Sequence, residues 1–193
     1  MVTVQNLSIN FGERDLFKNL GFFISEKERI GLIGKNGAGK STLMKILAGV
    51  QNPTTGEVII SKDRTTGYLP QEMEHAENTT ILEEASKAFE EVALLETKIE
   101  KLTQELTERT DYESEAYQNI IQDLSEANDR LTLLGAGNME QQIQKVLTGL
   151  EFEDTDMDRK MSEFSGGWKM RVELAKLLLK QPDMLLLDEP TNH

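Results

Sequence analysis

The chain has 193 residues, none of which is cysteine, and its formal net charge is -13 at pH 7. The length allows one sizeable core or one core plus an insertion, and the lack of cysteine excludes disulfides and thiolate metal sites. The acidic balance argues against a generally nucleic-acid-binding surface. Because the sequence has neither a signal-peptide pattern nor a run of 18 apolar residues, we expect a cytoplasmic protein.

The N-terminal residues predict a small antiparallel β layer. Residues 2–8 alternate apolar and polar side chains, residues 21–25 form a second strand-like run, and residues 10–14 make a turn between them. Further along, residues 57–60 and 66–69 read as short strands after a helical segment. Strand and helix signals therefore alternate, as an α/β fold requires.

A glycine-rich loop follows residues 29–33, which predict a short buried strand, and precedes a segment of helical composition. It fits the pattern G-x-x-x-x-G-K-[ST] and consists of Gly34, Lys35, Asn36, Gly37, Ala38, Gly39, Lys40 and Ser41. Its glycines let a phosphate approach the backbone, the lysine would meet the β and γ phosphates, and the serine hydroxyl would bind Mg²⁺. The pattern favours a nucleotide phosphate site over an ordinary glycine turn.

The middle of the chain differs in composition, since residues 72–134 hold 17 acidic and 5 basic side chains, a net charge of -12. Two apolar stripes with steps of three and four residues run from Ile81 to Leu106 and from Tyr117 to Leu134. Residues 107–111 lack the stripe, so we predict two antiparallel helices, the first roughly 35–40 Å long. Such a hairpin would project from a compact domain; alternatively, both helices cover the domain core.

The C-terminal third contains a second candidate anion site. Ser165, Gly166 and Gly167 precede a helical pattern that ends at Leu179. Serine is a good N-cap, and the two glycines leave the first N–H groups uncovered, so an anion could bind there. By itself this signal is weak, because many helices begin with serine and glycine.

A carboxylate pair follows the apolar run 184–187, which predicts a strand buried on both faces. Asp188 and Glu189 would lie at the carboxyl end of this strand, where α/β proteins bind ligands. Asp188 could hold Mg²⁺ directly or through water, and Glu189 could act as a general base on an attacking water. The alternative is a solvated acidic turn, which the nearby phosphate loop makes the less favoured interpretation.

Together these motifs resemble an ATP-binding-cassette (ABC) nucleotide domain, a P-loop NTPase. Residues 34–41 match its Walker A loop, Gln71 its Q-loop glutamine, residues 165–167 its signature, and residues 185–189 its Walker B motif. Phe11 stands where the family keeps an aromatic residue against adenine. The resemblance implies ATP and Mg²⁺ as cofactors, with Glu189 catalytic and the metal near Ser41, Gln71 and Asp188. It implies nucleotide contacts from Phe11, Gly34, Lys35, Asn36, Gly37, Ala38, Gly39, Lys40, Ser41, Thr42, Gln71, Ser165, Gly166 and Gly167.

Two features are similar to the ABC-F subfamily, soluble twin-cassette ATPases that act on ribosomes. Trp168 and the residues after it resemble the ABC-F form of the signature, and 94 positions separate Gln71 from Ser165. The excess length coincides with the predicted hairpin and matches the ABC-F arm. Phe164 departs from the usual leucine, and the D-loop, the switch histidine and a second cassette lie outside the chain.

The resemblance implies an α/β ABC cassette with an antiparallel β layer and an inserted helical hairpin. Residues 1–80 would form the first part of the nucleotide core, residues 81–134 the arm, and residues 135–193 the signature helix and Walker B. The implied partners are ATP, a second cassette of the same protein, and the ribosome, through a ribosomal protein or tRNA. The alternatives are the nucleotide-binding subunit of a transporter and an interaction module that uses the hairpin.

Overall fold

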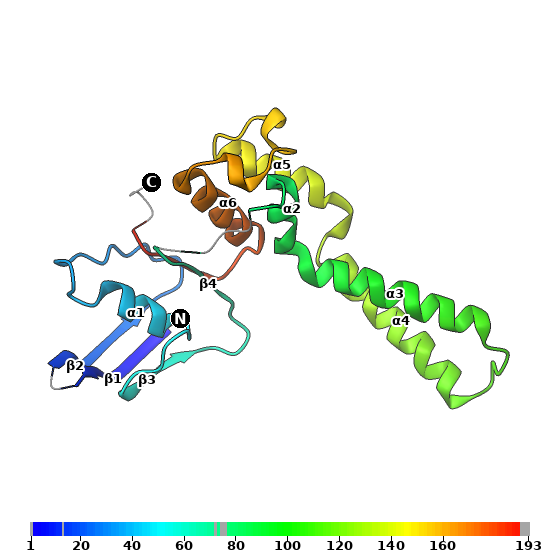
Figure 1. Cartoon of the computed structure of the whole chain (residues 1–193). Coiled ribbons are helices and arrows are strands. Elements are labelled where there is room, and N and C mark those ends of the chain that lie inside the picture. The colour runs from blue at the N-terminus through cyan, green and yellow to red at the C-terminus, as the bar shows by residue number, and fades with distance from the viewer. Residues whose placement is uncertain (1, 13, 72, 74–76, 190–193) are drawn as a thin grey trace. The chain divides into compact units, whose positions relative to one another are not determined.

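The computed structural model describes residues 2–12, 14–71, 73 and 77–189, without the side chains of Phe11, Arg14 and Ala136. The chain divides into two compact units (Figure 1). Unit 1 comprises Met1–Glu74 and Gln181–His193, and unit 2 comprises His75–Lys180.

Unit 1 contains the antiparallel β layer that the sequence predicted. The order of its strands is β2, β1, β3, with these bounds: β1 (Val2–Phe11), β2 (Arg14–Ile24) and β3 (Thr55–Ile60). Val4 of the central strand lies opposite Phe22 of β2 and Val58 of β3. The buried side chains of β1 are Val2, Val4, Leu7 and Ile9. They alternate with outward-facing residues except between Val4 and Leu7, where the register of β1 with β2 shifts.

Helix α1 (Lys40–Leu47) packs on this layer. Its apolar residues Leu43, Ile46 and Leu47 are buried in one cluster with Val2 and Val4 of β1. Burial of such side chains is stabilising by about 1.5–3 kcal/mol each relative to exposure. The packing therefore fixes the helix whose first two residues, Lys40 and Ser41, are the last two of the glycine-rich loop.

A second sheet pairs β4 (Thr66–Leu69) with β5 (Met184–Leu187) in parallel, as expected for the strand before the carboxylates. The prediction that this strand is buried on both faces is wrong, because Leu185 is 37% exposed. Met184 and Leu186 pack against the core of unit 1. The residue between them points away from that core, as strand alternation dictates.

The predicted strand at residues 29–33 does not form. Residues 28–35 have neither helix nor strand, and Ile33 is 95% exposed. Neither sheet of the described part of unit 1 includes this segment. A strand depends on its ladder and on an apolar layer to cover it, so an apolar run without those partners stays irregular here.

Unit 2 is helical in its described residues. Its α-helices are α2 (Ile81–Ser86), α3 (Glu90–Glu108), α4 (Glu115–Leu133), α5 (Met139–Gly149) and α6 (Gly166–Leu179). Short 3₁₀ turns connect them at η1 (Lys87–Phe89), η2 (Ala136–Asn138), η3 (Asp154–Asp156) and η4 (Met161–Glu163).

The predicted antiparallel hairpin is confirmed, and it consists of α3 and α4, which lie side by side and extend away from the other helices of unit 2 (Figure 1). Val92, Ile120 and Ala127 are buried in its seam. The expected single first helix is wrong, because η1 interrupts it and α3, with 19 residues, is about 28 Å long.

The first part of the apolar stripe belongs to a different core. Ile81 and Ala85 of α2 are fully buried with Leu147 of α5 and Val172 of α6. The stripe runs on unbroken in the sequence because both helices bury an apolar face, although each buries it against different partners. The hairpin is thus anchored through α2 on α6, the helix that begins at Gly166.

Candidate functional site

A cavity of about 400 Å³ in unit 1 brings together the glycine-rich loop, the start of α1 and two more distant side chains. Its lining residues are Leu16, Asn36, Gly37, Gly39, Lys40, Ser41, Thr42, Gln71 and Glu189. Most of them are residues for which the sequence predicted a nucleotide contact. Leu16 was not predicted, since nothing in the sequence shows that β2 passes the loop.

Gly39 joins the loop to α1 in a conformation that requires glycine. Its φ is 96°, in the left-handed region. A Cβ added there would lie 2.5 Å from Cζ of Phe17 and 2.9 Å from Cγ of Leu16. The loop can therefore pass this close to β2 only because residue 39 has no side chain.

The start of α1 presents donors to the cavity. The N–H of Leu43 bonds to the carbonyl of Gly39 at 2.9 Å, and no side chain caps the helix. The N–H groups of Lys40, Ser41 and Thr42 precede that bond and have no intrahelical acceptor. Together with the helix dipole they favour an anion at this end.

Lys40 reaches back over the loop. Its Nζ donates to the carbonyl oxygens of Gly34 at 3.0 Å and Lys35 at 3.4 Å. These bonds hold the ammonium group against the start of the loop, and Lys40 lines the same cavity as Ser41 and Thr42. A cation and several N–H donors at one point are suited to a polyphosphate.

Asp188 lies at the end of β5 and is only 3% exposed. Its N–H bonds to the carbonyl of Leu69 at 3.0 Å, and the Tyr68 hydroxyl donates to its Oδ2 at 3.5 Å. Burial, followed by the charge of Asp188, raises the pKa of the Tyr68 phenol. The sequence analysis did not predict the contact of Tyr68 with Asp188. That contact depends on the parallel register of β4 and β5, which pairs Tyr68 with Leu186, two residues before Asp188.

Glu189 and Gln71 meet in the cavity, with the Gln71 Nε2 donating to Glu189 Oε2 at 3.2 Å. The φ of Glu189 is 50°, which is uncommon for a residue with a side chain and costs on the order of 1–3 kcal/mol. Non-glycine residues in this region cluster at functional sites. The hydrogen bond uses the amide donor of Gln71 and leaves its oxygen as an acceptor.

The residues expected at Mg²⁺ fit that ion chemically. Ser41 offers a hydroxyl and Gln71 an amide oxygen, and both line the cavity. Asp188 is not among the lining residues and offers a buried carboxylate; all three are hard oxygen donors of the kind that Mg²⁺ prefers. In nucleotide sites this ion is usually held by one or two carboxylates together with phosphate oxygens. The donor set therefore agrees with a magnesium–nucleotide complex.

The signature residues lie in unit 2, at the start of α6. Ser165 is the N-cap, with extended backbone and no side-chain cap bond, and the N–H of Lys169 bonds to its carbonyl at 3.0 Å. A Cβ at Gly166 would meet nothing within 4 Å. This helix N-terminus is open, as the two glycines predicted. The backbone of Phe11 ends β1, while its side chain lies outside those that the structure describes.

The residues after the signature serve the packing of unit 2. The Trp168 ring lies 4.9 Å from that of Phe152, between ring centroids, and the Arg171 guanidinium lies 4.5 Å above Trp168. Phe164 packs against Phe152 at 6.0 Å between ring centroids.

Within the described part of the chain, no helix combines the length and apolar content needed to cross a bilayer.

Comparison with known proteins agrees with these motifs. The family model described as "ABC transporter" matches residues 17–192. The whole chain is 33% identical to ABC transporter F family member 5 of Arabidopsis thaliana, covering 28% of that protein. It is 34% identical over 94% of its length to the energy-dependent translational throttle protein EttA of Escherichia coli, covering 32% of it. It is 31% identical over 99% of its length to the tylosin resistance ATP-binding protein TlrC of Streptomyces fradiae, covering 34%.

Solved structures support the fold. The ATP-binding subunit of an ABC transporter superposes with a TM-score of 0.67 at 21% identity, over 100% of this chain and 67% of that one. The chain spans 28% to 34% of the length of the three relatives above. The family match covers most of the chain and includes the loop, the signature and the carboxylate pair. The chain therefore belongs to the ABC transporter family of ATP-binding cassettes.

Proposed function

We propose that the chain is the first cassette of a soluble twin-cassette ABC-F protein that binds and hydrolyses ATP while acting on the ribosome. The observation that carries the ATPase part is the cavity in which Lys40, Ser41, Gln71 and Glu189 meet. The ribosomal part is supported by the relatives, since one is named a translational throttle and another a tylosin resistance protein. A translation factor and an antibiotic-protection protein are both ABC-F activities of this kind.

In this proposal the start of α1 and Lys40 bind the phosphates of ATP. Ser41 and Asp188, with Gln71 as a further oxygen donor, would hold Mg²⁺, which would supply positive charge to the phosphates. Glu189 accepts a proton from the attacking water as general base. Its bond to Gln71 orients the carboxylate toward the cavity before substrate arrives.

The site is proposed to be composite. The open N-terminus of α6 at Ser165, Gly166 and Gly167 would bind the γ-phosphate of a nucleotide held by the second cassette. That cassette's signature would in turn complete the site at residues 34–42. ATP then joins the two cassettes, and hydrolysis releases them.

The hairpin is proposed to contact a basic ribosomal protein. Its turn carries Arg109, whose Nε and Nη2 bond to Asp111 at 3.0 and 2.6 Å and whose Nη1 lies 3.6 Å from Glu105. The charge of this arginine is therefore already compensated. An acidic hairpin whose tip arginine is paired in this way favours a cationic protein surface over RNA phosphates.

Cosedimentation with ribosomes tests the proposal. Full-length Glu189→Gln protein should pellet with ribosomes in ATP and remain in the supernatant in ADP. A photo-crosslinking amino acid in place of Tyr112, which is 60% exposed at the hairpin turn, should label a basic ribosomal protein. Absence of ATP-dependent binding would reject the ribosomal role, and labelling mainly of rRNA would reject the protein contact.

The same experiment separates the two alternatives. A nucleotide-binding subunit of a transporter would bind a membrane partner and show no ATP-dependent ribosome association. A pure interaction module would bind its partner equally well after Lys40→Ala, because nucleotide would have no part in binding. The proposed cassette should lose ATP-dependent association with that substitution.

A further inference from the structure

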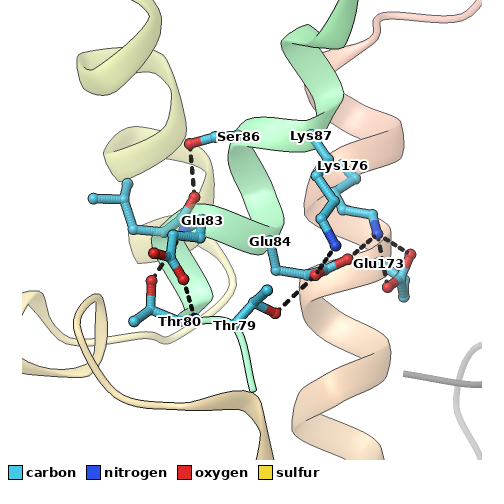
Figure 2. Close-up of polar contacts among 9 residues, drawn as sticks. Thr79, Thr80, Glu83, Glu84, Ser86, Lys87, Glu173 and Lys176 are labelled. Carbon is cyan, nitrogen blue, oxygen red and sulfur yellow. Dashed lines mark hydrogen bonds and ion pairs between the residues drawn. The ribbon is translucent and has the colours of Figure 1, made fainter. Parts of the chain in front are cut away.

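Unit 2 contains an ion-pair cluster that we call the buried ion-pair cluster after its two buried carboxylates, Glu84 and Glu173. Its other members are Thr79, Lys176 and the exposed Lys87 (Figure 2). Glu84 on α2 is 3% exposed, and both of its carboxylate oxygens are bonded. Lys176 Nζ on α6 donates to Oε1 at 2.7 Å, while Lys87 Nζ at 2.6 Å and the Thr79 hydroxyl at 3.0 Å donate to Oε2.

Lys176 also binds within its own helix. Its Nζ lies 2.8 Å from the carboxylate of Glu173, which is 6% exposed (Figure 2). One ammonium group thus neutralises a buried carboxylate on α2 and another on α6. Charged hydrogen bonds are directional, whereas apolar packing in the surrounding core, which includes Ala85 and Ala175, allows small sliding.

Backbone hydrogen bonds join the start of α2 to residues 157–161, the segment that precedes the signature in the chain. The N–H groups of Ile81 and Leu82 bond to the carbonyls of Arg159 and Met157, both at 3.0 Å. In the opposite direction, the N–H of Met161 bonds to the carbonyl of Thr79 at 2.9 Å. The signature is therefore flanked by these backbone hydrogen bonds on its N-terminal side and by Lys176 on its C-terminal side.

We propose that Glu84 and Lys176 are positioning residues that couple the signature end of α6 to the hairpin. They fix α2, which leads through η1 into α3 (Figure 1), to the helix that begins at Gly166. When a nucleotide on the second cassette engages the signature, the hairpin then moves with α6 as one body. This inference rests on the proposed function and adds the contact that transmits nucleotide binding to the ribosome-binding element.

Distance measurements between spin labels test the coupling without a ribosome. The labels are attached at Glu113→Cys in the hairpin turn and Leu178→Cys on α6, in full-length protein whose other cysteines are replaced. The unsubstituted background should give one narrow distance distribution, with and without ATP. Lys176→Met should broaden it, because Glu84 and Glu173 are then left without their shared cation.

Two variants control this result. Lys176→Arg keeps the charge and should restore the narrow distribution. Lys180→Met removes the same charge from the exposed end of the same helix and should leave the distribution narrow. If Lys176→Met does not fold, Glu84→Gln, which keeps the shape but loses the charge, serves instead.

A functional readout separates coupling from general destabilisation. Lys176→Met should weaken ATP-dependent ribosome binding about tenfold and leave ATP affinity without ribosomes essentially unchanged. A narrow distribution in both Lys176→Met and Glu84→Gln would overturn the proposal, as would equal broadening in Lys180→Met. Failure of the unsubstituted protein to bind ribosomes in ATP would instead reject the proposed function, while the label distances still decide the coupling.

Discussion

Gln71 and Glu189 meet because each lies two residues beyond the end of its strand, β4 or β5. Leu69 and Leu187, the last residues of these strands, are opposite one another in the parallel register. Two residues further on, the Gln71 amide donates to the Glu189 carboxylate at 3.2 Å. A shift of the register by one residue would separate them, so the parallel pair positions the proposed general base.

Glu189→Gln should trap ATP at this site. The substitution removes the proton acceptor but keeps an oxygen to receive the Gln71 bond, so binding should persist while hydrolysis slows by about 10²- to 10⁴-fold. Nucleotide recovered from the purified full-length protein after incubation with ATP should include ATP for the variant and ADP for the parent. Recovery of ADP alone from the variant would contradict the assignment of Glu189.

Gly39→Ala should lower ATP affinity by at least about tenfold, since residue 39 combines a positive φ with contact to β2. The new methyl group would collide with Phe17 and Leu16 and displace the start of α1. Gly37→Ala is the matched comparison, because Gly37 has a φ of 76° but nothing within 4 Å of its Cβ position. Gly37→Ala should lower ATP affinity less than Gly39→Ala, as measured by titration with a fluorescent ATP analogue, and the difference reports the effect of the collision with β2. Equal decreases in affinity would show that the collision has no effect.

The buried ion-pair cluster should make unit 2 acid-sensitive. Burial opposes ionisation of Glu84, but its hydrogen bonds from Lys176, Lys87 and Thr79 outweigh it and lower its pKa from 4.5 to about 2. Because the pKa of Glu84 is lower in the folded state than in the unfolded state, its ionised form stabilises the fold. This stabilisation is fully present above pH 4.5 and is lost as the pH falls toward 2. The free energy of unfolding should decrease by about 3 kcal/mol over this range. From α6, Lys176 forms an ion pair with Glu84, and Glu173 forms an ion pair with the same lysine.

Hydrogen exchange measures this effect locally. Amides of α2 and α6 in the full-length protein should be better protected in the parent than in Glu84→Gln at pH 6, after correction for intrinsic exchange rates. The difference should shrink steadily as the pH falls below 4.5. Parallel protection curves across this range would show that Glu84 does not titrate as the contacts imply.

The motif positions could be predicted because phosphate and metal chemistry restrict the residue types at each point. The glycine-rich loop, Gln71 and Glu189 do line one cavity. The rule that α/β proteins bind ligands at the carboxyl ends of their strands predicted the place of the carboxylate pair, whereas Gln71 was predicted only through the family resemblance. The same rule gave no register, so Tyr68 next to Asp188 was not foreseen.

The apolar pattern was a weaker guide, because it shows that a face is buried but not against what. The stripe from Ile81 onward serves two cores on either side of η1. Glu84 shows the same limit for charged residues, since it stands among many solvated glutamates in the sequence and only the approach of α6 buries it. Residues 29–33 show the converse, an apolar run without a paired neighbour.

The paired arginine at the hairpin turn gives a test of which partner the hairpin meets. Asp111→Asn removes the carboxylate that binds Arg109 through two hydrogen bonds and so releases a cation at the tip. Against a basic protein this should weaken ATP-dependent ribosome binding several-fold, because an attraction is lost and a repulsion is gained. Against RNA the freed guanidinium should strengthen binding, through a new phosphate contact that high salt removes.

Glu113→Gln is the control, because it removes an equal charge from the same turn without releasing Arg109. It should weaken binding less than Asp111→Asn. Cosedimentation at low and high salt distinguishes these results, and tighter binding of Asp111→Asn with new rRNA crosslinks would show that RNA is the partner.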